Sequence, residues 1–335
     1  MALKPPVEVP QGAIRFNTDS QKMEFFAQDQ WWQMATDFPT LDGGAARGIM
    51  AGGGDPNHSN IIQAFNISTQ GNTFDFGNLT AARYYIGGCA SRTRAVWGGG
   101  NEGSGYVDTI EYSTISTLGD AVAFGELVGA DRHGLTGVAN QTRGMYAGGE
   151  SPTKYNDIDY ITIASTGDAK DFGNLQTARS TSSGFSSPTR GIIAGGTEPS
   201  QVNTIDYVTI ATLGNAQDFG DQSSTVYGGG GGGNATRGVM MGGYSNPDNS
   251  NKIQFLTIAT KGNTTDFGDI TQARRYGATC STPTRAVYCG GIFPALSNVM
   301  DFIQIATQGD AVDFGDLFDH HYAFPNGCSN AHGGL

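Results

Sequence analysis

One phrase occurs six times along this chain, and its period restricts the fold more than any single residue does. Each copy begins with an arginine, continues into a glycine pair and ends at a phenylalanine, which in five copies stands in the triplet D-F-G. The arginines recur every 47 to 49 residues: Arg47, Arg94, Arg143, Arg190, Arg237 and Arg285. A period of about 40 to 50 residues is typical of propellers and solenoids, because one such unit cannot bury its apolar face alone.

Each copy contains four strand signals separated by turn residues. In the fourth copy these are residues 182–187, 190–194, 204–211 and 216–219. The third strand carries apolar residues on both faces, as expected for a small sheet packed between two others. The sequence therefore predicts an all-β fold, a six-bladed β-propeller of four-stranded blades over residues 39–335.

The two ends of the repeat region predict how the ring closes. The first copy starts at Arg47 and has no strand of the first type before it, whereas residues 322–329 form such a strand with no arginine strand after it. We expect the C-terminal strand to complete the first blade, because closure removes both open sheet edges.

Composition excludes several classes of partner. Only 19 of the 335 residues are Lys or Arg and the formal net charge is −12, so no nucleic-acid partner is expected. There is no apolar run of about 18 residues and no signal-peptide core in residues 1–10, which predicts no membrane insertion and synthesis in a cytoplasm. The cysteines, Cys89, Cys280, Cys289 and Cys328, occupy repeat positions typical of small buried residues, so we expect free thiols.

Residues 12–36 alternate apolar and polar side chains in three short runs. Ile14 and Phe16, then Met23 and Phe25, then Trp32 and Met34 are predicted to share one face of a three-stranded meander, with turns at residues 18–20 and 28–29. A sheet this small is marginal alone. We therefore assign residues 1–38 to docking or oligomerisation, with Ile14, Phe16, Phe25 and Trp32 as its contact residues.

Two sets of residues resemble known families. The glycine pair and an aromatic on each third strand resemble kelch-type propellers, although the kelch tryptophan of the fourth strand is replaced by the phenylalanine of D-F-G. The phrase G-x-I-R-F-N-T with the later E-F resembles a module of tailed-phage fibre proteins, and the repeat phrase I-A-T-x-G-[DN]-A-x-D-F-G resembles repeats in virion proteins of marine cyanobacterial phages. The resemblance implies a virion component made in the host cytoplasm.

No motif predicts catalysis, a cofactor or a transition-metal site. The D-F-G triplets come without the other kinase motifs, and the glycine run at 228–233 is not followed by the Lys-Ser/Thr of a phosphate-binding loop. The histidines, His58, His133, His320, His321 and His332, have no zinc-site spacing. Calcium at the Asp- and Asn-rich stretches 55–60 and 246–251 stays open, since the regular Asp spacing is missing.

The six repeat arginines allow two interpretations. They could form an anion site at one mouth of the channel, or each guanidinium could pair with a carboxylate such as Asp75, Asp171, Asp218, Asp266 or Asp313, or cap a blade carbonyl. We favour the structural role, because a residue present in every blade serves what every blade needs.

The loops between the second and third strands vary between copies and are expected on the same face as the crossovers between blades. Recognition usually resides in variable loops on a rigid scaffold. The candidate recognition residues are His58, Tyr106, Lys154, Tyr155, Tyr244, Asn249 and Phe293. The alternative is that these loops are solvated turns or face another virion protein.

We expect a non-enzymatic virion structural protein, a fibre knob or a capsid decoration, that contacts other virion proteins through its N-terminal segment. The alternative is a receptor protein that binds a host-surface carbohydrate with the variable-loop face. A homo-oligomer is compatible with either function.

Overall fold

The computed structural model describes residues 10, 12–17, 22–27, 30–33, 46–54, 57–318 and 326–335. The chain divides into two compact units, Met1–Gly44 and Ala45–Leu335. The predicted domain boundary, between residues 38 and 39, lies outside the described residues. Each unit is considered by itself.

The first unit is an antiparallel sheet of β1 (Ile14–Asn17), β2 (Lys22–Ala27) and β3 (Gln30–Gln33). Its register aligns Ile14, Phe25 and Trp32 in one row across the strands and sets Phe16 opposite Met23. This confirms the predicted meander. The predicted turns and Met34 lie outside the described residues.

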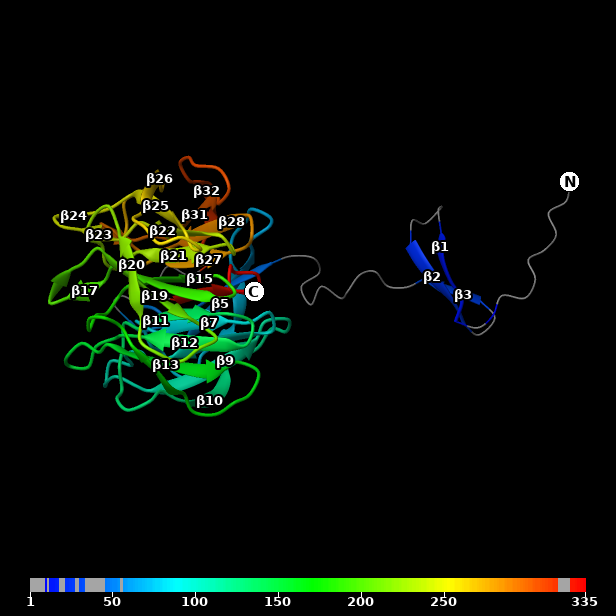
Figure 1. Ribbon diagram of the computed structural model, residues 1–335, viewed down its shortest axis with the longest axis horizontal. Helices are drawn as coiled ribbons and strands as arrows, with labels where there is room; N and C mark the ends of the chain where they lie inside the picture. The colour runs from blue at the N-terminus through cyan, green and yellow to red at the C-terminus, as the bar shows by residue number, and fades with distance from the viewer. Residues whose placement is uncertain are drawn as a thin grey trace, which may run out of the picture. The chain divides into compact units, whose positions relative to one another are not determined.

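The second unit is a six-bladed propeller of four-stranded antiparallel sheets (Figure 1). Blade 1 contains β33 (Asn326–Ser329), β4 (Arg47–Ala51), β5 (Ile61–Asn66) and β6 (Phe74–Asn78); blade 2 contains β7 (Gly87–Ala90), β8 (Arg94–Gly98), β9 (Thr109–Thr114) and β10 (Val122–Glu126); blade 3 contains β11 (Thr136–Ala139), β12 (Arg143–Ala147), β13 (Asp157–Thr162) and β14 (Lys170–Asn174). Blade 4 contains β15 (Ser183–Ser186), β16 (Arg190–Ala194), β19 (Thr204–Thr209) and β20 (Gln217–Asp221); blade 5 contains β21 (Gly230–Gly233), β22 (Arg237–Met241), β25 (Lys252–Thr257) and β26 (Thr265–Asp269); blade 6 contains β27 (Ala278–Ser281), β28 (Arg285–Cys289), β31 (Val299–Gln304) and β32 (Val312–Asp316). The predicted fold class is therefore confirmed.

Three of the variable loops form short hairpins of their own. They are β17 (Thr197–Glu198) with β18 (Ser200–Gln201), β23 (Tyr244–Ser245) with β24 (Asp248–Asn249), and β29 (Ile292–Phe293) with β30 (Ala295–Leu296). They belong to blades 4, 5 and 6, and each hairpin directly follows the second strand of its blade.

Blade 1 closes the ring with the C-terminal strand, as predicted. β33 pairs antiparallel with β4, and Cys328 lies opposite Ile49. The strand begins at Asn326, and the preceding residues 319–325 lie outside the described part. The two ends of the propeller therefore meet in one sheet, in which β33 takes the inner position and β4 is no longer an edge strand.

The D-F-G phrase forms a contact between neighbouring blades. All six phenylalanines at the centre of the phrase are buried. In blades 2 to 6 this phenylalanine packs edge to face against the aromatic residue of the third strand of its own blade, for example Phe124 against Tyr112 with ring centroids 5.9 Å apart. The glycine permits close approach of two backbones: at Gly77 the φ angle is 151°, and a Cβ would lie 2.4 Å from the carbonyl oxygen of Gly119 in blade 2. The repeated triplet therefore contributes to the packing of one blade against the next.

Candidate recognition site on the variable-loop face

The repeat arginines cap carbonyls of the next blade. In each, Nη1 donates to the carbonyl of the isoleucine that follows the third strand of the neighbour: Arg47 to Ile115 (2.5 Å), Arg94 to Ile163 (2.9 Å), Arg143 to Ile210 (2.6 Å), Arg190 to Ile258 (2.8 Å), Arg237 to Ile305 (2.7 Å) and Arg285 to Ile67 (3.2 Å). The D-F-G aspartates are exposed, and no ion pair joins them to these arginines in the described part of the chain. The predicted pairing of these arginines with the D-F-G carboxylates is therefore wrong, and the alternative role, capping of blade carbonyls, is the one that the structure shows.

We expect Arg190→Glu to lower the free energy of unfolding by about 2 kcal/mol, because it removes charge-assisted hydrogen bonds to Ile258 and Ala259 and sets a carboxylate against carbonyl oxygens. Chemical denaturation measures the loss. Ligand binding at the opposite, variable-loop face should not change. A fully stable variant would contradict the structural role.

A second set of arginines, not predicted from the sequence, forms ion pairs between blades. Each lies in the crossover that leaves one blade and reaches a carboxylate on the third strand of the next. The pairs are Arg83 with Glu111, Arg132 with Asp159, Arg179 with Asp206 (3.2 Å) and Arg274 with Asp301 (2.8 Å), and every side chain is at most 2% exposed. Burial raises the pKa of Asp206, and the charge of Arg179 opposes that rise.

The seam between blades 4 and 5 replaces both members of this pair. Val226 occupies the crossover position of the arginines, since its carbonyl accepts from Gly196 as the carbonyl of Arg179 does from Gly149. Gln254 lies opposite Met240 in register, as Asp206 lies opposite Ile193. The Gln254 Oε1 still accepts from the backbone N–H of Ser223 at 2.9 Å, the role that Asp206 has for Gln176 at 3.2 Å. At this seam a neutral residue therefore replaces each member of the ion pair.

The crossovers and the variable loops lie on the same face of the propeller, as predicted. Residues of the two segments pair in isolated bridges: Tyr84 with Asn101, His133 with Glu150, Ser180 with Thr197, Tyr227 with Tyr244 and Arg275 with Ile292. Because these bridges lie at the start of each inner strand, the variable loops surround one mouth of the axial channel.

Three of the predicted recognition residues contact the crossovers. The ring of His58 stacks on Tyr84 with centroids 4.7 Å apart, and Tyr106 stacks on His133 at 4.3 Å. Tyr244 lies against Tyr227, with centroids 5.4 Å apart. These contacts hold the variable loops against the crossovers.

The other four predicted residues are dispersed. Lys154 donates from Nζ to the Thr197 hydroxyl at 2.5 Å, and Tyr155 donates to the carbonyl of Ser151 at 3.0 Å. Asn249 donates from Nδ2 to the carbonyl of Ile292 at 3.2 Å, and Phe293 is 45% exposed at a hairpin tip. Lys154 and Asn249 link neighbouring loops, whereas Tyr155 supports its own loop, and the four residues do not converge on one site.

The channel mouth is bounded by a rim of backbone hydrogen bonds that runs from blade to blade. The N–H of Gly134 donates to the carbonyl of Tyr85, that of Thr181 to Gly134, that of Gly228 to Thr181 and that of Tyr276 to Gly228, at 2.8, 2.9, 2.9 and 2.6 Å. All five residues have a left-handed backbone, with φ of 57°, 69°, 56°, 65° and 60° in chain order. The geometry suits glycine, so Tyr85, Thr181 and Tyr276 each cost about 1 kcal/mol or more.

Tyrosines and one arginine gather beside this rim. The ring centroid of Tyr276 lies 5.7 Å from that of Tyr85 and 5.8 Å from that of Tyr227. The guanidinium of Arg275 lies 4.8 Å from the ring of Tyr244 and 5.3 Å from that of Tyr276. Burial raises the pKa of Tyr85 and of Tyr276, so both phenols stay protonated at neutral pH. We call Tyr85, Tyr227, Tyr244, Arg275 and Tyr276 the mouth cluster.

A polar groove adjoins the mouth cluster at Tyr227. It runs between the variable loops of blades 4 and 5 and is lined by Thr197, Pro199, Ser200, Gln201, Thr225, Tyr227 and Asn246. Gln201 Oε1 accepts from the N–H of Asn246 at 3.1 Å, which ties the two loops together. Tyr276 and Tyr85 line the hollow at the mouth itself, together with Thr181, Ser182 and Asn326.

Of these residues, the sequence predicted only Tyr244. The missing signal was the pair that follows the crossover arginine position, Tyr84-Tyr85, His133-Gly134, Ser180-Thr181, Tyr227-Gly228 and Arg275-Tyr276. This pair varies at a fixed place in the repeat, as the loop residues do, and it lies on the same face.

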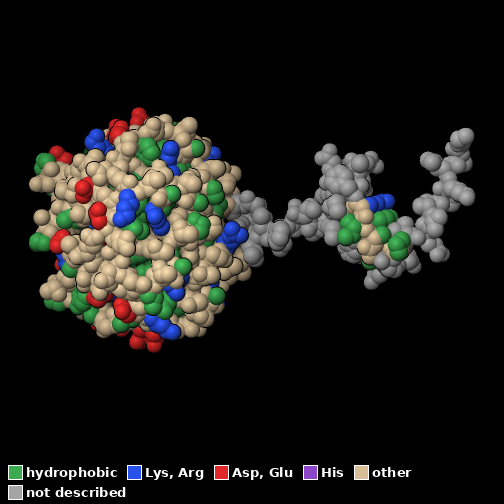
Figure 2. Space-filling view, in the orientation of Figure 1, with side chains coloured by type: hydrophobic (Ala, Val, Ile, Leu, Met, Phe, Trp, Pro, Cys, Tyr) green, Lys and Arg blue, Asp and Glu red, His purple; other side chains and the backbone are tan. Residues whose placement is uncertain are grey.

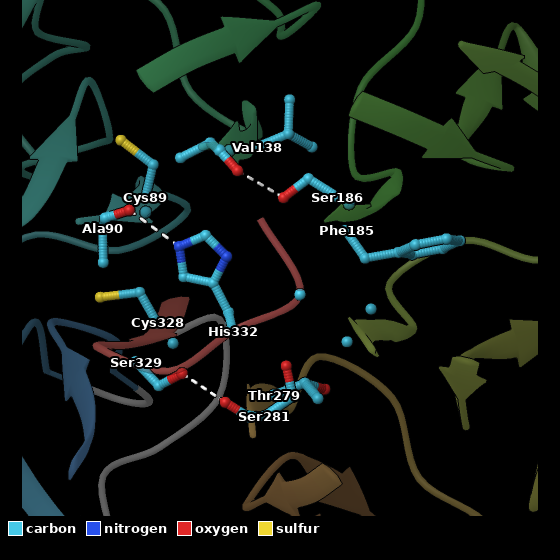
Figure 3. A pocket seen from close by; sticks show the side chains of 18 of the residues that line it. Cys89, Ala90, Val138, Phe185, Ser186, Thr279, Ser281, Cys328, Ser329 and His332 are labelled. Atoms are coloured by element: carbon cyan, nitrogen blue, oxygen red, sulfur yellow. Dashed lines mark hydrogen bonds between the residues drawn. The ribbon is translucent and has the colours of Figure 1, made fainter. Parts of the chain in front are cut away.

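The opposite mouth of the channel is covered by the C-terminal residues (Figure 3). His332 points across the inner strands, and its Nε2 donates to the carbonyl of Ala90 at 2.8 Å while its Nδ1 accepts from the N–H of Gly334 at 3.1 Å. The inner strands contribute Cys89, Cys328 and the hydrogen-bonded pair Ser281 and Ser329 to the same channel. All four cysteines are free and buried, as predicted.

Acid should destabilise the propeller through His332. Burial lowers the pKa of His332 below its usual 6.5, so the folded state holds it neutral while the unfolded chain takes up a proton. Stability is therefore lost as the pH falls below about 6.5. Thermal melting at pH 7.5 and 5.5 should give a smaller difference for His332→Gln than for the natural chain, and equal differences would contradict this assignment.

No group of three or more histidine, cysteine or acidic side chains in the described residues could hold a metal ion. The described residues also include no helix long and apolar enough to cross a membrane.

Charged side chains of both signs are interspersed on the visible face of the propeller, among a majority of uncharged groups (Figure 2). The stretch 55–60 considered for calcium includes residues 55 and 56, which lie outside the described residues.

No protein-family model matches this chain. No curated protein matches it either.

Proposed function

We propose that this chain is a non-enzymatic structural protein of a phage particle, held by residues 1–38 and displaying a kelch-like propeller. The observation that supports this most directly is the division of the chain into a small sheet unit and a closed propeller. The strand register pairs Ile14 with Phe25 and Phe25 with Trp32, and Ile14 is 57% exposed. An apolar row on so small a sheet is suited to docking on another virion protein or on a second copy of the chain.

Removal of residues 1–38 tests this proposal. We expect the truncated protein to melt like the full chain, because the ring contacts described here all lie within the propeller, and to be absent from purified particles. The point variant Ile14→Asp should also reduce incorporation, because it places a charge in the docking row. Incorporation of the truncated protein at the natural level would refute the anchor.

We propose carbohydrate recognition at the variable-loop face as a second function. The mouth cluster supports it: several tyrosine rings lie close together beside hydroxyl and amide groups. The C–H faces of a sugar ring pack on aromatic rings, and its hydroxyls require groups that donate and accept. A glycan array probed with the full chain tests this function, and the absence of any bound glycan would refute it while leaving the structural role in place.

A further inference from the structure

Arg275 has no acidic partner in the described part of the chain, which leaves out residues 319–325. Each of the four buried crossover arginines pairs with a carboxylate, whereas no carboxylate of the described residues lies within ion-pair distance of Arg275. Its Nε is buried and has no hydrogen-bond partner among those residues. A guanidinium normally finds an anion or carbonyls for its fixed set of donors. Arg275 therefore has unused capacity to bind an anion.

The surrounding tyrosines hold this guanidinium in place. Tyr244 and Tyr276 both lie within cation–π distance, at 4.8 and 5.3 Å, and the positive charge of Arg275 also acts on the hydroxyl of Tyr85. An arginine that is already oriented loses little side-chain entropy when a ligand binds. Its position next to Tyr276 brings the charge to the edge of the channel mouth.

The backbone at Tyr85 and Tyr276 gives an independent indication of function. The rim requires a left-handed conformation, and blades 3 and 5 meet that requirement with Gly134 and Gly228. Tyrosine is unfavourable there, and residues held in such conformations concentrate at ligand sites. The ring of Tyr276 lies over Gly228, where a Cβ would come within 2.7 Å of it. Both tyrosines are therefore placed at the mouth despite a conformational cost.

We propose that the mouth cluster binds an acidic sugar residue, with Arg275 receiving a carboxylate or sulfate and the tyrosine rings packing against the sugar. This inference rests on the proposed carbohydrate recognition and names the ligand class. The groove beyond Tyr227, with Thr197, Gln201, Thr225 and Asn246, supplies hydroxyl and amide groups for neighbouring uncharged sugars. The ligand is therefore an oligosaccharide with one acidic residue at the channel mouth.

Calorimetric titration of the full chain tests this with three probes: a galacturonate tetrasaccharide, a sulfated galactose tetrasaccharide and a neutral galactose tetrasaccharide. We expect the charged probes to bind more tightly than the neutral one, and the preferred charged probe identifies the anion as carboxylate or sulfate. Arg275→Gln should weaken the charged probes by at least about tenfold and leave the neutral probe unchanged. Arg275→Lys should retain part of the affinity.

Two further variants separate binding from folding. Tyr276→Gly installs the residue that blades 3 and 5 use, so it should fold at least as well while it weakens all three probes. Arg92→Gln removes an exposed charge from a hairpin on the opposite face and should change no affinity. Unchanged binding of charged probes by Arg275→Gln, or a neutral probe that binds as tightly, overturns the inference but leaves carbohydrate recognition intact. If no probe binds, this inference falls, and the glycan array alone decides on recognition.

Discussion

Arg274→Val and Asp301→Gln should each destabilise the propeller by about 3 to 5 kcal/mol, whereas the double variant should recover most of that loss. Each single change leaves one buried charge without its partner in the seam between blades 5 and 6. The double variant reproduces the neutral combination that the chain already uses as Val226 and Gln254. Its glutamine can still accept from the backbone N–H of Thr271, as Asp301 does at 3.3 Å.

Chemical denaturation of the four proteins as a double-mutant cycle measures the coupling. Arg274 keeps carbonyl acceptors at Gly290, Tyr288 and Val299, so Asp301→Gln should be the milder single change. The reciprocal control introduces the pair elsewhere: Val226→Arg alone should destabilise the seam between blades 4 and 5, and Gln254→Asp should rescue it. Additive effects in both cycles would show that the paired charges do not interact.

Removal of residues 326–335 should abolish the cooperative unfolding transition and cause aggregation. The deletion takes away the inner strand of blade 1, so β4 loses its hydrogen-bonded neighbour and its buried residues, including Ile49, lose cover. An open strand with unpaired backbone groups is a template for association between chains. Thermal melting and light scattering measure both effects.

A matched control removes residues 1–10, a segment of equal length at the other end, and should leave the melting transition of the propeller unchanged. A synthetic peptide of residues 326–335 added to the truncated protein should restore the transition as its concentration rises, because binding to the folded state stabilises it by mass action. A truncated protein that melts like the full chain would refute closure by this strand.

The architecture could be predicted from the sequence because the same phrase fixes the same contacts six times. Phe124 and the glycine pair could be placed from one copy and checked against five others, and the unmatched strand signal at the C-terminus predicted the closure. The hydrogen-bond partner of Arg190 could not be predicted in this way, because the sequence alone does not distinguish a carboxylate acceptor from a backbone carbonyl acceptor. Only the three-dimensional register selects the carbonyl of Ile258.

The candidate site was harder to predict because it depends on what differs between copies. Variable loops drew attention to His58, Tyr106 and Tyr244, and the structure brings these against the crossovers. Tyr85 and Tyr276 were not predicted, because their left-handed backbone is indicated in the sequence only indirectly, by the glycines at the equivalent positions Gly134 and Gly228. Phe293 was selected because it belongs to a variable loop, and it lies at a hairpin tip, 45% exposed.

The ion pairs across the seams also limit how this repeat can grow or shrink. Blades 2 to 5 each supply a third-strand side chain at the seam with the blade before and a crossover side chain at the seam with the blade after, so each of them fits only between compatible neighbours. Loss of blade 3 would set Arg132 beside Asp206 and keep a matched pair. Loss of blade 5 would set Val226 beside Asp301 and bury a lone carboxylate. Duplication or deletion of blades is therefore tolerated at some places in the gene and costly at others, although the repeats look interchangeable.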